Sequence, residues 1–421
     1  MSACIWYVSK YVALPTARKG SARAFLLLRE MAALGHRCVI LTSDSNHLTT
    51  PPHVEGHLFS ETVDGVDVHW IRTLKFAGAS SVRRILSWID FEWRLWRLPK
   101  APLPSPDVVI VSSPSLLTIF NGLLLRRRYR CRLIFEVRDI WPLTLIEEGG
   151  YSPFNPFVMG FRAVELLAYR FADEIVGTMP NLGQHVAESL GRHPPVSCIP
   201  FGVHADMIEQ AQPLPIDWIK RHIPEHKYLV CYAGSIGISN ALETLFACAS
   251  DMRDHSDVHF LIVGEGGLKS HYEGVAAALD NVSLTGSVPK DVVPSVLALC
   301  DLLYFSVHTS KVWDYGLSLN KVIDYMLAAK PIVASYTGFR TMVEDAQAGI
   351  SVPAGDPAAL KRAILRLKAQ PRSELTEMGE RGRRWAWTNL NYRKLADDYL
   401  RVALRRDAPG SLGRTPNGPH R

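Results

Sequence analysis

Segments of buried-strand length alternate with segments of helix length along this chain of 421 residues, and the series occurs twice. Apolar strands are predicted first at residues 4–9, 36–43, 106–114, 131–139 and 173–180, with helices such as 22–35 and 116–130 between them. A second series runs through 227–237, 258–267, 281–286, 301–307 and 330–335. Buried strands separated by helices predict parallel sheets covered on both faces.

The two series predict an α/β protein with two Rossmann-like, doubly wound domains that face a cleft. We expect an N-terminal domain over residues 1–205 and a second domain over 206–385. A C-terminal helix is expected over 386–406, and a Pro- and Gly-rich, disordered tail over 407–421. Ligands of such sheets bind beyond the carboxyl ends of the strands, so the loops after strands are the places to look for chemistry.

Net charge, cysteine spacing and the absence of known motifs limit the other classes of site. The formal net charge of +6 permits nucleic acid, an anionic membrane surface or a phosphate-bearing substrate, and selects none of them. The seven cysteines have no zinc-type spacing and are expected to be reduced core residues of a cytoplasmic protein. Neither a membrane-spanning apolar run nor a signal peptide is found, and no HExxH, GxSxG or DxD motif occurs.

Two glycine-rich loops follow predicted strands of the second domain. Gly234, Ser235 and Gly237 belong to the first loop, and Glu265 and Gly266 belong to the second. Glycines at such positions let a phosphate approach backbone N–H groups at a helix start. The alternative is a tight strand–helix turn that needs glycine for its conformation alone. Two such loops in one domain favour a nucleotide site, although neither is a dinucleotide or P-loop motif.

Lys321 and Asp324 share one face near the start of a short apolar helix. A helix that only fills a core needs neither charge. Lys321 would neutralise a diphosphate, and Asp324 would accept hydrogen bonds from sugar hydroxyls. The alternative is a solvated ion pair within the helix.

Arg138 and Asp139 end a predicted strand of the first domain, where charged side chains would face the cleft. The alternative role for Asp139 is to cap the following turn.

The segment 81–97 carries tryptophan and arginine on one amphipathic helix. Trp88, Trp93 and Trp96 fall on the apolar side, which Arg84 interrupts. This composition is typical of a membrane-interface helix, and the basic run 126–132 would add to a footprint on anionic lipid. The alternatives are a helix packed on its own domain and a solvated basic helix end.

Taken together, these segments resemble the retaining glycosyltransferases of family 4, which have the GT-B fold. The resemblance covers roughly residues 1–400. It rests on EVRDIWP, YAGSIG, LIVGEGG followed by NVSLTGSV, then GLSLNKVIDYMLAAKPIVAS, Glu344 and AGISVPAGDPAAL. The EVRDIWP and YAGSIG versions resemble the subgroup that builds bacterial surface polysaccharides.

The resemblance implies a role for each domain. The second domain would hold the donor, a nucleotide diphosphate sugar, through Gly234, Ser235, Gly237, Glu265, Gly266, Val288, Lys321, Val322 and Glu344. The first domain would hold the acceptor near Gly20, Arg23, Arg138 and Asp139. Asp139, Lys321 and Asp324 would be the catalytic residues. The C-terminal helix would cross back to the first domain, as in other GT-B proteins.

This chain departs from the family pattern in its acids and cations. The family usually has two glutamates eight residues apart, and here these positions hold Gly316 and Asp324. Ser235 and Asn240 stand where many members have arginine and lysine, and Arg138 replaces a common histidine. Lys321 is therefore the main cationic candidate for the phosphates.

The sequence predicts a retaining glycosyltransferase that moves a hexose, or an N-acetylated or deoxy sugar, to a polyprenyl-diphosphate-linked saccharide in polysaccharide, O-antigen, lipopolysaccharide or capsule biosynthesis. We expect a peripheral protein on the inner face of the bacterial cytoplasmic membrane, with an anionic lipid surface as partner. No cofactor, metal or nucleic acid is expected. The alternatives are a non-hydrolysing nucleotide-sugar epimerase of the same fold and a catalytically inactive donor-binding partner.

Overall fold

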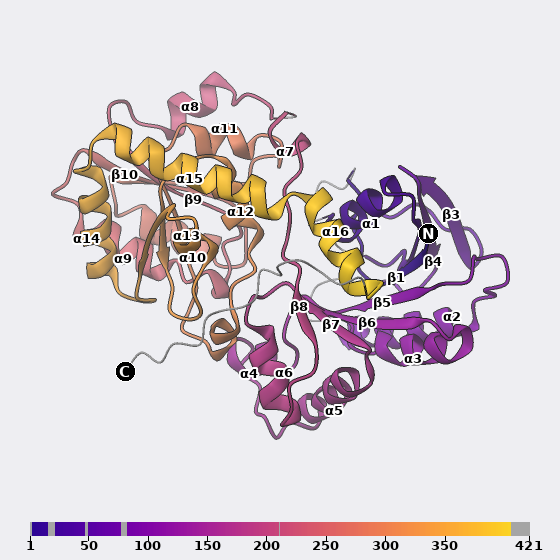
Figure 1. The fold of residues 1–421 in the computed structure, drawn as a ribbon. Coiled ribbons are helices and arrows are strands. Elements are labelled where there is room, and N and C mark those ends of the chain that lie inside the picture. The colour runs from indigo at the N-terminus through magenta and orange to yellow at the C-terminus, as the bar shows by residue number, and fades with distance from the viewer. Residues whose placement is uncertain (1, 16–21, 47–48, 77–81, 210, 406–421) are drawn as a thin grey trace. The chain divides into compact units, whose positions relative to one another are not determined.

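The computed structural model describes residues 2–15, 22–46, 49–76, 82–209 and 211–405, and the chain forms two compact units (Figure 1). Unit 1 comprises Met1–Pro200 and Tyr392–Arg421, and unit 2 comprises Phe201–Asn391. The second unit is thus inserted, in sequence, between the body of the first unit and its last helix. Both units have the predicted α/β architecture.

Within the described residues, unit 1 contains an eight-stranded sheet in the order β3-β4-β2-β1-β5-β6-β7-β8. Its strands are β1 Cys4–Val8, β2 Arg37–Ser43, β3 Leu58–Val63, β4 Val66–Ile71, β5 Val108–Ser112, β6 Arg132–Val137, β7 Glu174–Gly177 and β8 Val196–Cys198. The edge strand β3 pairs antiparallel with β4, and the other pairs are parallel. The central strand β1 is buried throughout, which explains its unbroken apolar sequence.

The helices of unit 1 are α1 Arg23–Ala33, α2 Val82–Arg97, α3 Thr118–Tyr129, α4 Leu143–Glu147, α5 Pro156–Phe171, α6 Leu182–Leu190 and α16 Tyr392–Ala403. The last of these, α16, lies beside α1 (Figure 1). Tyr399 and Leu400 of α16 are buried in the same cluster as Phe25 and Leu28 of α1. The far C-terminal part of the described chain therefore completes the core of unit 1.

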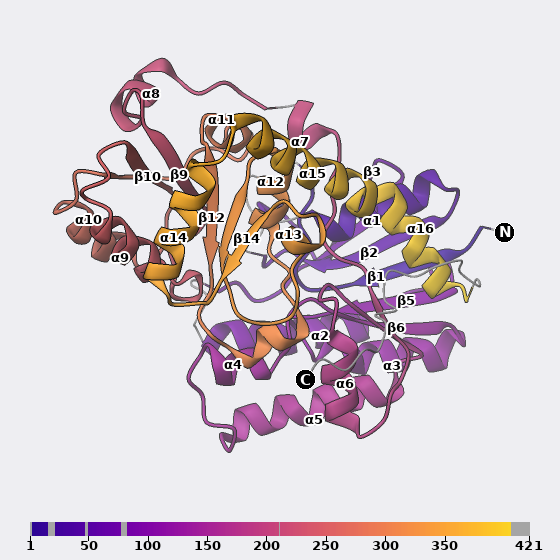
Figure 2. The ribbon, with the colours of Figure 1, turned by 60° about the vertical axis from the view of Figure 1, so that its left-hand side comes forward.

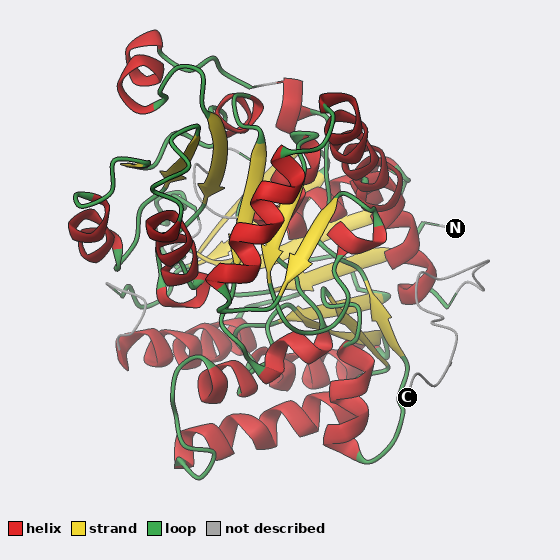
Figure 3. Cartoon of the chain, turned by 90° about the vertical axis from the view of Figure 1, so that its left-hand side faces the viewer, coloured by secondary structure: helices red, strands yellow, loops and turns green. Residues whose placement is uncertain are grey.

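Unit 2 contains, within the described residues, a fully parallel six-stranded sheet in the order β11-β10-β9-β12-β13-β14. Its strands are β9 Tyr228–Ala233, β10 Val258–Val263, β11 Val282–Thr285, β12 Leu302–Ser306, β13 Ile332–Ser335 and β14 Gly349–Val352. Its helices are α7 Asp206–Glu209, α8 Ile216–His222, α9 Glu243–Asp251, α10 Lys269–Ala276, α11 Val293–Ala298, α12 Asn320–Leu327, α13 Met342–Asp345, α14 Pro357–Lys368 and α15 Arg372–Leu390. Buried clusters on both faces of this sheet show that helices cover it on two sides (Figures 2 and 3).

The C-terminal helix differs from the prediction. A single helix was expected over 386–406, but the structure has two helices, α15 and α16, that are separated at Asn391. Asn391 has an extended backbone, with φ −60° and ψ 130°. It forms a bridge with Val203, whose N–H donates to the carbonyl of Leu390. The break lets the chain pass from the core of unit 2 to that of unit 1, which helical periodicity alone does not reveal.

No helix in the described ranges is long and apolar enough to cross a bilayer. The cysteines are free, and six of the seven are buried.

Candidate donor site in unit 2 and predicted acceptor residues in unit 1

The two glycine-rich loops of unit 2 lie against each other at the carboxyl ends of β9 and β10. The N–H of Gly234 donates to the carbonyl of Val263 over 3.0 Å, and the N–H of Ile236 donates to that of Glu265 over 2.8 Å. A Cβ atom on Gly264 would lie only 1.8 Å from the carbonyl oxygen of Gly234. Glycine is therefore required at 264 for packing of the loops, a reason that applies with or without a ligand.

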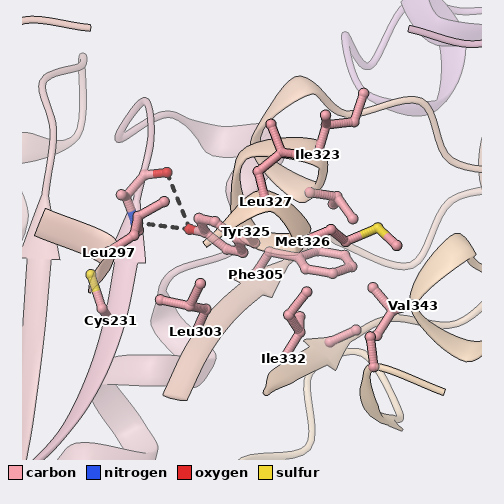
Figure 4. Close-up of a cluster of buried hydrophobic side chains, with 14 of the residues drawn as sticks. Cys231, Leu297, Leu303, Phe305, Ile323, Tyr325, Met326, Leu327, Ile332 and Val343 are labelled. Atoms are coloured by element: carbon pink, nitrogen blue, oxygen red, sulfur yellow. Dashed lines mark hydrogen bonds between the residues drawn. The ribbon is translucent and has the colours of Figure 1, made fainter. Parts of the chain in front are cut away.

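The Tyr325 side chain is hydrogen-bonded to the end of β9. Its hydroxyl accepts a hydrogen bond from the N–H of Ala233 over 2.8 Å and donates to the carbonyl of the same residue over 3.1 Å (Figure 4). Tyr325 comes from α12, and its ring is buried among Leu303, Phe305 and Met326. Helix α12 is thus held directly to the end of β9, immediately before the first glycine-rich loop.

Lys321, also on α12, extends to that first loop. Its Nζ donates to the hydroxyl of Tyr232 over 2.9 Å and to the Oδ1 atom of Asn240. The same nitrogen lies 4.6 Å from the centre of the Tyr232 ring. A Cβ on Gly234 would lie 3.3 Å from Nζ, so the absence of a side chain at 234 leaves room beside the ammonium group. The predicted proximity of Lys321 and Gly234 is present in the structure.

Tyr232 and Asn240 complete a polar network that the sequence reasoning did not assign to the site. The Tyr232 hydroxyl donates to the Ser235 carbonyl over 2.6 Å, and the Asn240 amide donates to the same carbonyl over 2.9 Å and to the Ser235 hydroxyl over 3.1 Å. In the sequence, Asn240 is recognisable only as a replacement for the lysine that many family members have. Tyr232 lies near the end of β9, a strand of mainly apolar residues. Its sequence context therefore did not distinguish it from a residue that only packs in the core.

Burial shifts both charged groups of α12 toward neutrality. Desolvation lowers the pKa of Lys321 to about 7. Desolvation likewise raises the pKa of Asp324 to about 6, and the charge of Lys290 partly opposes this shift. Within the described part of the chain the two groups form no ion pair with each other, so the alternative of a solvated intrahelical pair is wrong. Shifted pKa values of this kind concentrate at functional sites.

The second loop supplies an exposed carboxylate. Glu265 pairs with Lys269 at 2.7 Å, and that hydrogen bond holds the pKa of Glu265 below its usual range. Gly266 is exposed, and a Cβ there would lie 2.1 Å from the carbonyl of Ile236. Gly237 is partly exposed with open space around it. These positions are accessible to a ligand, and their donor role stays a prediction.

Three further predicted donor residues have other surroundings. Val322 was predicted to line the donor, but its side chain is fully buried and its N–H donates to Leu319, so it packs the core instead. Val288 is partly buried against the same core. Glu344 caps α13 through reciprocal hydrogen bonds with Thr341. That capping box explains Glu344 without a ligand, and contact of Glu344 or Val288 with a donor stays a prediction.

Arg138 and Asp139 lie at the carboxyl end of β6 in unit 1. The Nε atom of Arg138 is buried and has no hydrogen-bond partner among the described residues. Asp139 accepts hydrogen bonds from Trp141 Nε1 at 2.8 Å and from the Thr144 hydroxyl at 2.7 Å. These bonds stabilise the turn into α4, which is the alternative role foreseen for Asp139. Arg138 is the better candidate of the two for contact with a ligand.

Arg23 was predicted to contact the acceptor, and the structure contradicts this. Its side chain is 1% exposed, and its Nη1 atom pairs with Glu136 at 2.7 Å. It also donates to the carbonyls of Pro200 and Ile199. Burial acts to lower the pKa of Arg23, but the charge and hydrogen bond of Glu136, together with Tyr7 and Tyr399, raise it overall. Arg23 is thus a structural residue, and Gly20 lies outside the described residues.

The residues of α2 that were predicted to contact a membrane differ in exposure, and membrane contact of the exposed ones stays a prediction. Trp88 is buried, with its ring edge-to-face against Trp141 and Phe161 and its Nε1 donating to the Tyr11 hydroxyl. Its prediction as a membrane-contact residue is therefore wrong. Trp93 and Trp96 are half exposed, at 50% and 52%. Arg84 is partly buried, with its guanidinium over the Trp88 ring at 5.5 Å, so it packs on the domain.

In the parts of the chain that the structure describes, no cluster of three or more His, Cys, Asp or Glu side chains could hold a metal ion.

Two family models match the chain, one in each unit. "Glycosyl transferase 4-like domain" matches residues 20–202, and "Glycosyl transferases group 1" matches residues 227–370. Among curated proteins, the chain is 26% identical to alpha-D-kanosaminyltransferase of Streptomyces kanamyceticus over 36% of this chain and 39% of that protein. It is 27% identical to 2-deoxystreptamine glucosyltransferase of the same organism, over 53% and 58% of the two chains. These alignments span well under two thirds of each relative.

A longer alignment joins the chain to phosphatidyl-myo-inositol mannosyltransferase of Mycobacterium leprae, at 25% identity over 81% of each chain. Among solved structures, sucrose-phosphate synthase from Thermosynechococcus elongatus has a TM-score of 0.70 at 16% identity, covering 96% of this chain and 98% of that one. The Anabaena HepE complex with UDP-glucose has a TM-score of 0.62 at 13% identity, covering 96% and 100%. These structures have the same fold. The chain belongs to the group 1 glycosyltransferases, the retaining family 4, and has the GT-B fold.

Proposed function

We propose that the protein transfers a hexose, or an N-acetylated or deoxy sugar, from a nucleotide diphosphate sugar to a polyprenyl-diphosphate-linked saccharide during bacterial surface-polysaccharide synthesis. The transfer retains the configuration of the anomeric carbon. The observation that carries the proposal is the placement of Lys321 Nζ beside Gly234, with Tyr232 and Asn240 as its partners. A cation beside a glycine at the carboxyl end of a parallel strand suits an anionic ligand.

In this proposal the diphosphate lies along the first glycine-rich loop, and Lys321 donates a charge-assisted hydrogen bond to it. The bond strengthens as negative charge develops on the departing diphosphate, which lowers the barrier to transfer. The Tyr232 hydroxyl and Asn240 Oδ1 hold the ammonium group in place before the donor arrives. Asp324 accepts hydrogen bonds from hydroxyls of the donor, and Glu265 is exposed for a similar role.

The lipid-linked acceptor is supported by the surface of unit 1. Leu86, Ile89, Trp93 and Trp96 are each about half exposed on α2 and recur at helical spacing. The guanidinium of Arg97 lies 4.5 Å from the centre of the Trp93 ring. Aromatic and basic side chains together on one exposed helix face suit a membrane interface. The mycobacterial relative is named for transfer to phosphatidyl-myo-inositol, a lipid, which agrees with an acceptor held at a membrane.

Loss of the first motif acid favours one rival, a donor-binding protein without turnover. Gly316 has φ +105°, a conformation that side-chain-bearing residues rarely adopt. The backbone conformation at position 316 therefore favours glycine over a glutamate. In the proposed reaction, Asp324 acts without a second carboxylate at position 316.

Transfer can be tested with labelled UDP-, GDP- and dTDP-sugars and a lipid-linked saccharide extract, with phase partition to follow the label. The proposal predicts that label from at least one donor moves to the lipid phase. An inactive partner would bind a donor, as measured by calorimetry, without any transfer. An epimerase would convert the donor to a new sugar nucleotide in the absence of lipid. Either result would refute the proposed reaction.

A further inference from the structure

Arginines line a hollow of about 530 Å³ in unit 1, a volume typical of small-molecule sites. The residues around it are Leu123, Arg126, Arg127, Arg130, Cys131, Arg132, Asp173 and Arg405. They come from the end of α3, the start of β6, the residue before β7 and the segment after α16. The fold therefore assembles the hollow from segments that are far apart in the sequence.

The hollow lies at the amino end of β6, whereas Arg138 follows the carboxyl end of the same strand. Strand β6 runs for six residues from Arg132 to Val137, which is roughly 20 Å. Ligands of parallel α/β sheets bind at the carboxyl ends of the strands, and the arginines are at the amino end. The hollow is thus separate from the predicted acceptor residues, and an inference about it does not depend on the proposed transfer reaction.

Charge around the hollow is unbalanced. Arg126 pairs with Asp173 at 2.5 Å, and Arg132 pairs with Glu174 at 3.3 Å. The guanidinium groups of Arg127, Arg130 and Arg405 form no hydrogen bond or ion pair with any residue in the described ranges. Glu174 also attracts Arg405, so the five arginines face two carboxylates, and a bound polyvalent anion would relieve the remaining repulsion.

A simpler explanation accounts for only part of this cluster. Basic residues in the last turn of a helix interact favourably with its dipole, and Arg126 and Arg127 occupy the last turn of α3. Arg132 belongs to a strand, and Arg405 follows a different helix. Arg132 also donates to the carbonyls of Val402 and Ala403 at the end of α16. That contact brings the segment that carries Arg405 to the hollow.

We propose that this hollow binds a phosphate group. Guanidinium groups match phosphate geometry through paired hydrogen bonds, and several of them around one cavity suit a di- or trivalent oxyanion. The phosphate would belong either to a free phosphate compound or to the headgroup of an anionic phospholipid. The basic run 126–132, predicted as a lipid footprint or a solvated helix end, thereby becomes part of a defined site.

The test uses the full chain and two double variants. Arg127→Gln with Arg130→Gln removes two exposed cations that have no partner in the described chain. Arg253→Gln with Arg372→Gln removes the same charge from exposed positions of unit 2 and is the control. The first probes are orthophosphate and pyrophosphate, read out by the shift in melting temperature. The second are phosphatidylcholine vesicles with and without phosphatidylglycerol, read out by co-sedimentation.

A free phosphate compound is the source if the inorganic anions stabilise the wild type and control, and the hollow variant requires at least about tenfold more anion for the same shift. A lipid headgroup is the source if only vesicles with phosphatidylglycerol bind, and the hollow variant loses that binding relative to the control. The proposal is overturned if the wild type responds to neither probe, or if both variants respond alike. Donor binding by the hollow variant should equal that of the wild type, which separates this proposal from the proposed function.

Discussion

The Nζ atom of Lys321 lies 2.9 Å from the hydroxyl oxygen of Tyr232, and that hydroxyl in turn donates to the carbonyl of Ser235. A helix residue and a glycine-rich loop are therefore connected through one tyrosine at the end of β9. Burial lowers the pKa of Lys321 to about 7, because the charged ammonium group loses hydration. A bound anionic ligand would offset this desolvation cost.

Tyr232→Phe removes the hydroxyl that positions Lys321 and leaves the aromatic ring. We expect donor affinity to fall by roughly 3- to 10-fold, the loss of one hydrogen bond worth about 1 kcal/mol. Calorimetric titration with the donor measures this change. Tyr304→Phe is the matched control, because Tyr304 is another buried strand tyrosine of unit 2, and Lys321 donates to the hydroxyl of Tyr232 and not to that of Tyr304 in the described chain. Equal affinities for the two variants would exclude a positioning role for Tyr232.

Asp324→Asn should stabilise the protein while it impairs transfer. The folded-state pKa of Asp324 is raised to about 6, so the carboxylate destabilises the fold as pH rises through the range from about 4 to 6. Asparagine carries no charge and should raise the free energy of unfolding at pH 7.5 by about 1–2 kcal/mol, with little change at pH 4. Urea unfolding at both pH values measures the difference. A variant that is less stable at pH 7.5, or that transfers sugar at the wild-type rate, would contradict this account.

Donor binding should weaken as pH rises above about 7. The phosphate contact needs the protonated ammonium group of Lys321, and its pKa of about 7 means that the proton is lost from the free protein above this pH. Titration of wild type and Lys321→Arg across pH 6 to 9 measures the effect, because the arginine stays charged throughout. The wild type should lose affinity steadily, whereas the arginine variant should have a flatter profile. Parallel profiles would show that another group controls binding.

Glu136→Gln should destabilise unit 1 strongly. Glu136 is fully buried and accepts hydrogen bonds from Arg23, Tyr7 at 2.6 Å and Ser112 at 2.9 Å. The substitution leaves the Arg23 charge buried without its counter-ion, which costs about 3–5 kcal/mol. Urea unfolding followed by fluorescence measures the loss. Glu61→Gln is a partly exposed control on the same sheet. A midpoint close to that of the control would mean that the ion pair does not hold the fold.

Trp93→Ser with Trp96→Ser should release the protein from vesicles that contain anionic lipid. Each substitution removes a half-exposed indole ring whose apolar area would be buried in the membrane interface. We therefore expect vesicle affinity to fall by at least about tenfold. Co-sedimentation measures the bound fraction. Phe154→Ser removes an aromatic side chain that is 84% exposed outside α2, and it should leave binding unchanged. If the tryptophan variant sediments like this control, α2 is not a membrane helix.

The alternation of apolar strands and helices was enough to predict two parallel α/β units, because strands of a covered parallel sheet are short, nearly continuous apolar runs between longer helical segments. The glycine-rich loop after a strand, together with the family resemblance, placed Gly234 and Lys321 in one predicted donor site. Sequence reasoning failed for Arg23, whose partner Glu136 lies on a strand more than a hundred residues away. An arginine at a helix start looks the same in sequence whether it faces a ligand or a buried carboxylate. Trp88 failed similarly, because helical periodicity cannot tell an apolar face that packs inward from one that is exposed.

The break at Asn391 and the contribution of Tyr232 to the site also could not be predicted from the sequence. Both depend on contacts between segments distant in sequence, namely Val203 with Asn391 and Lys321 with Tyr232. Local patterns carry no record of such contacts.

Calorimetric titration of Lys321→Ala with UDP-, GDP- and dTDP-sugars tests the central claim most directly. Lys220→Ala removes the same charge from an exposed position on α8 and serves as the control. A charge-assisted hydrogen bond to phosphate is worth roughly 1.5–3 kcal/mol, so the donor that binds the wild type should bind Lys321→Ala at least about tenfold more weakly and the control equally well. Affinity within twofold of the wild type in Lys321→Ala would contradict the account.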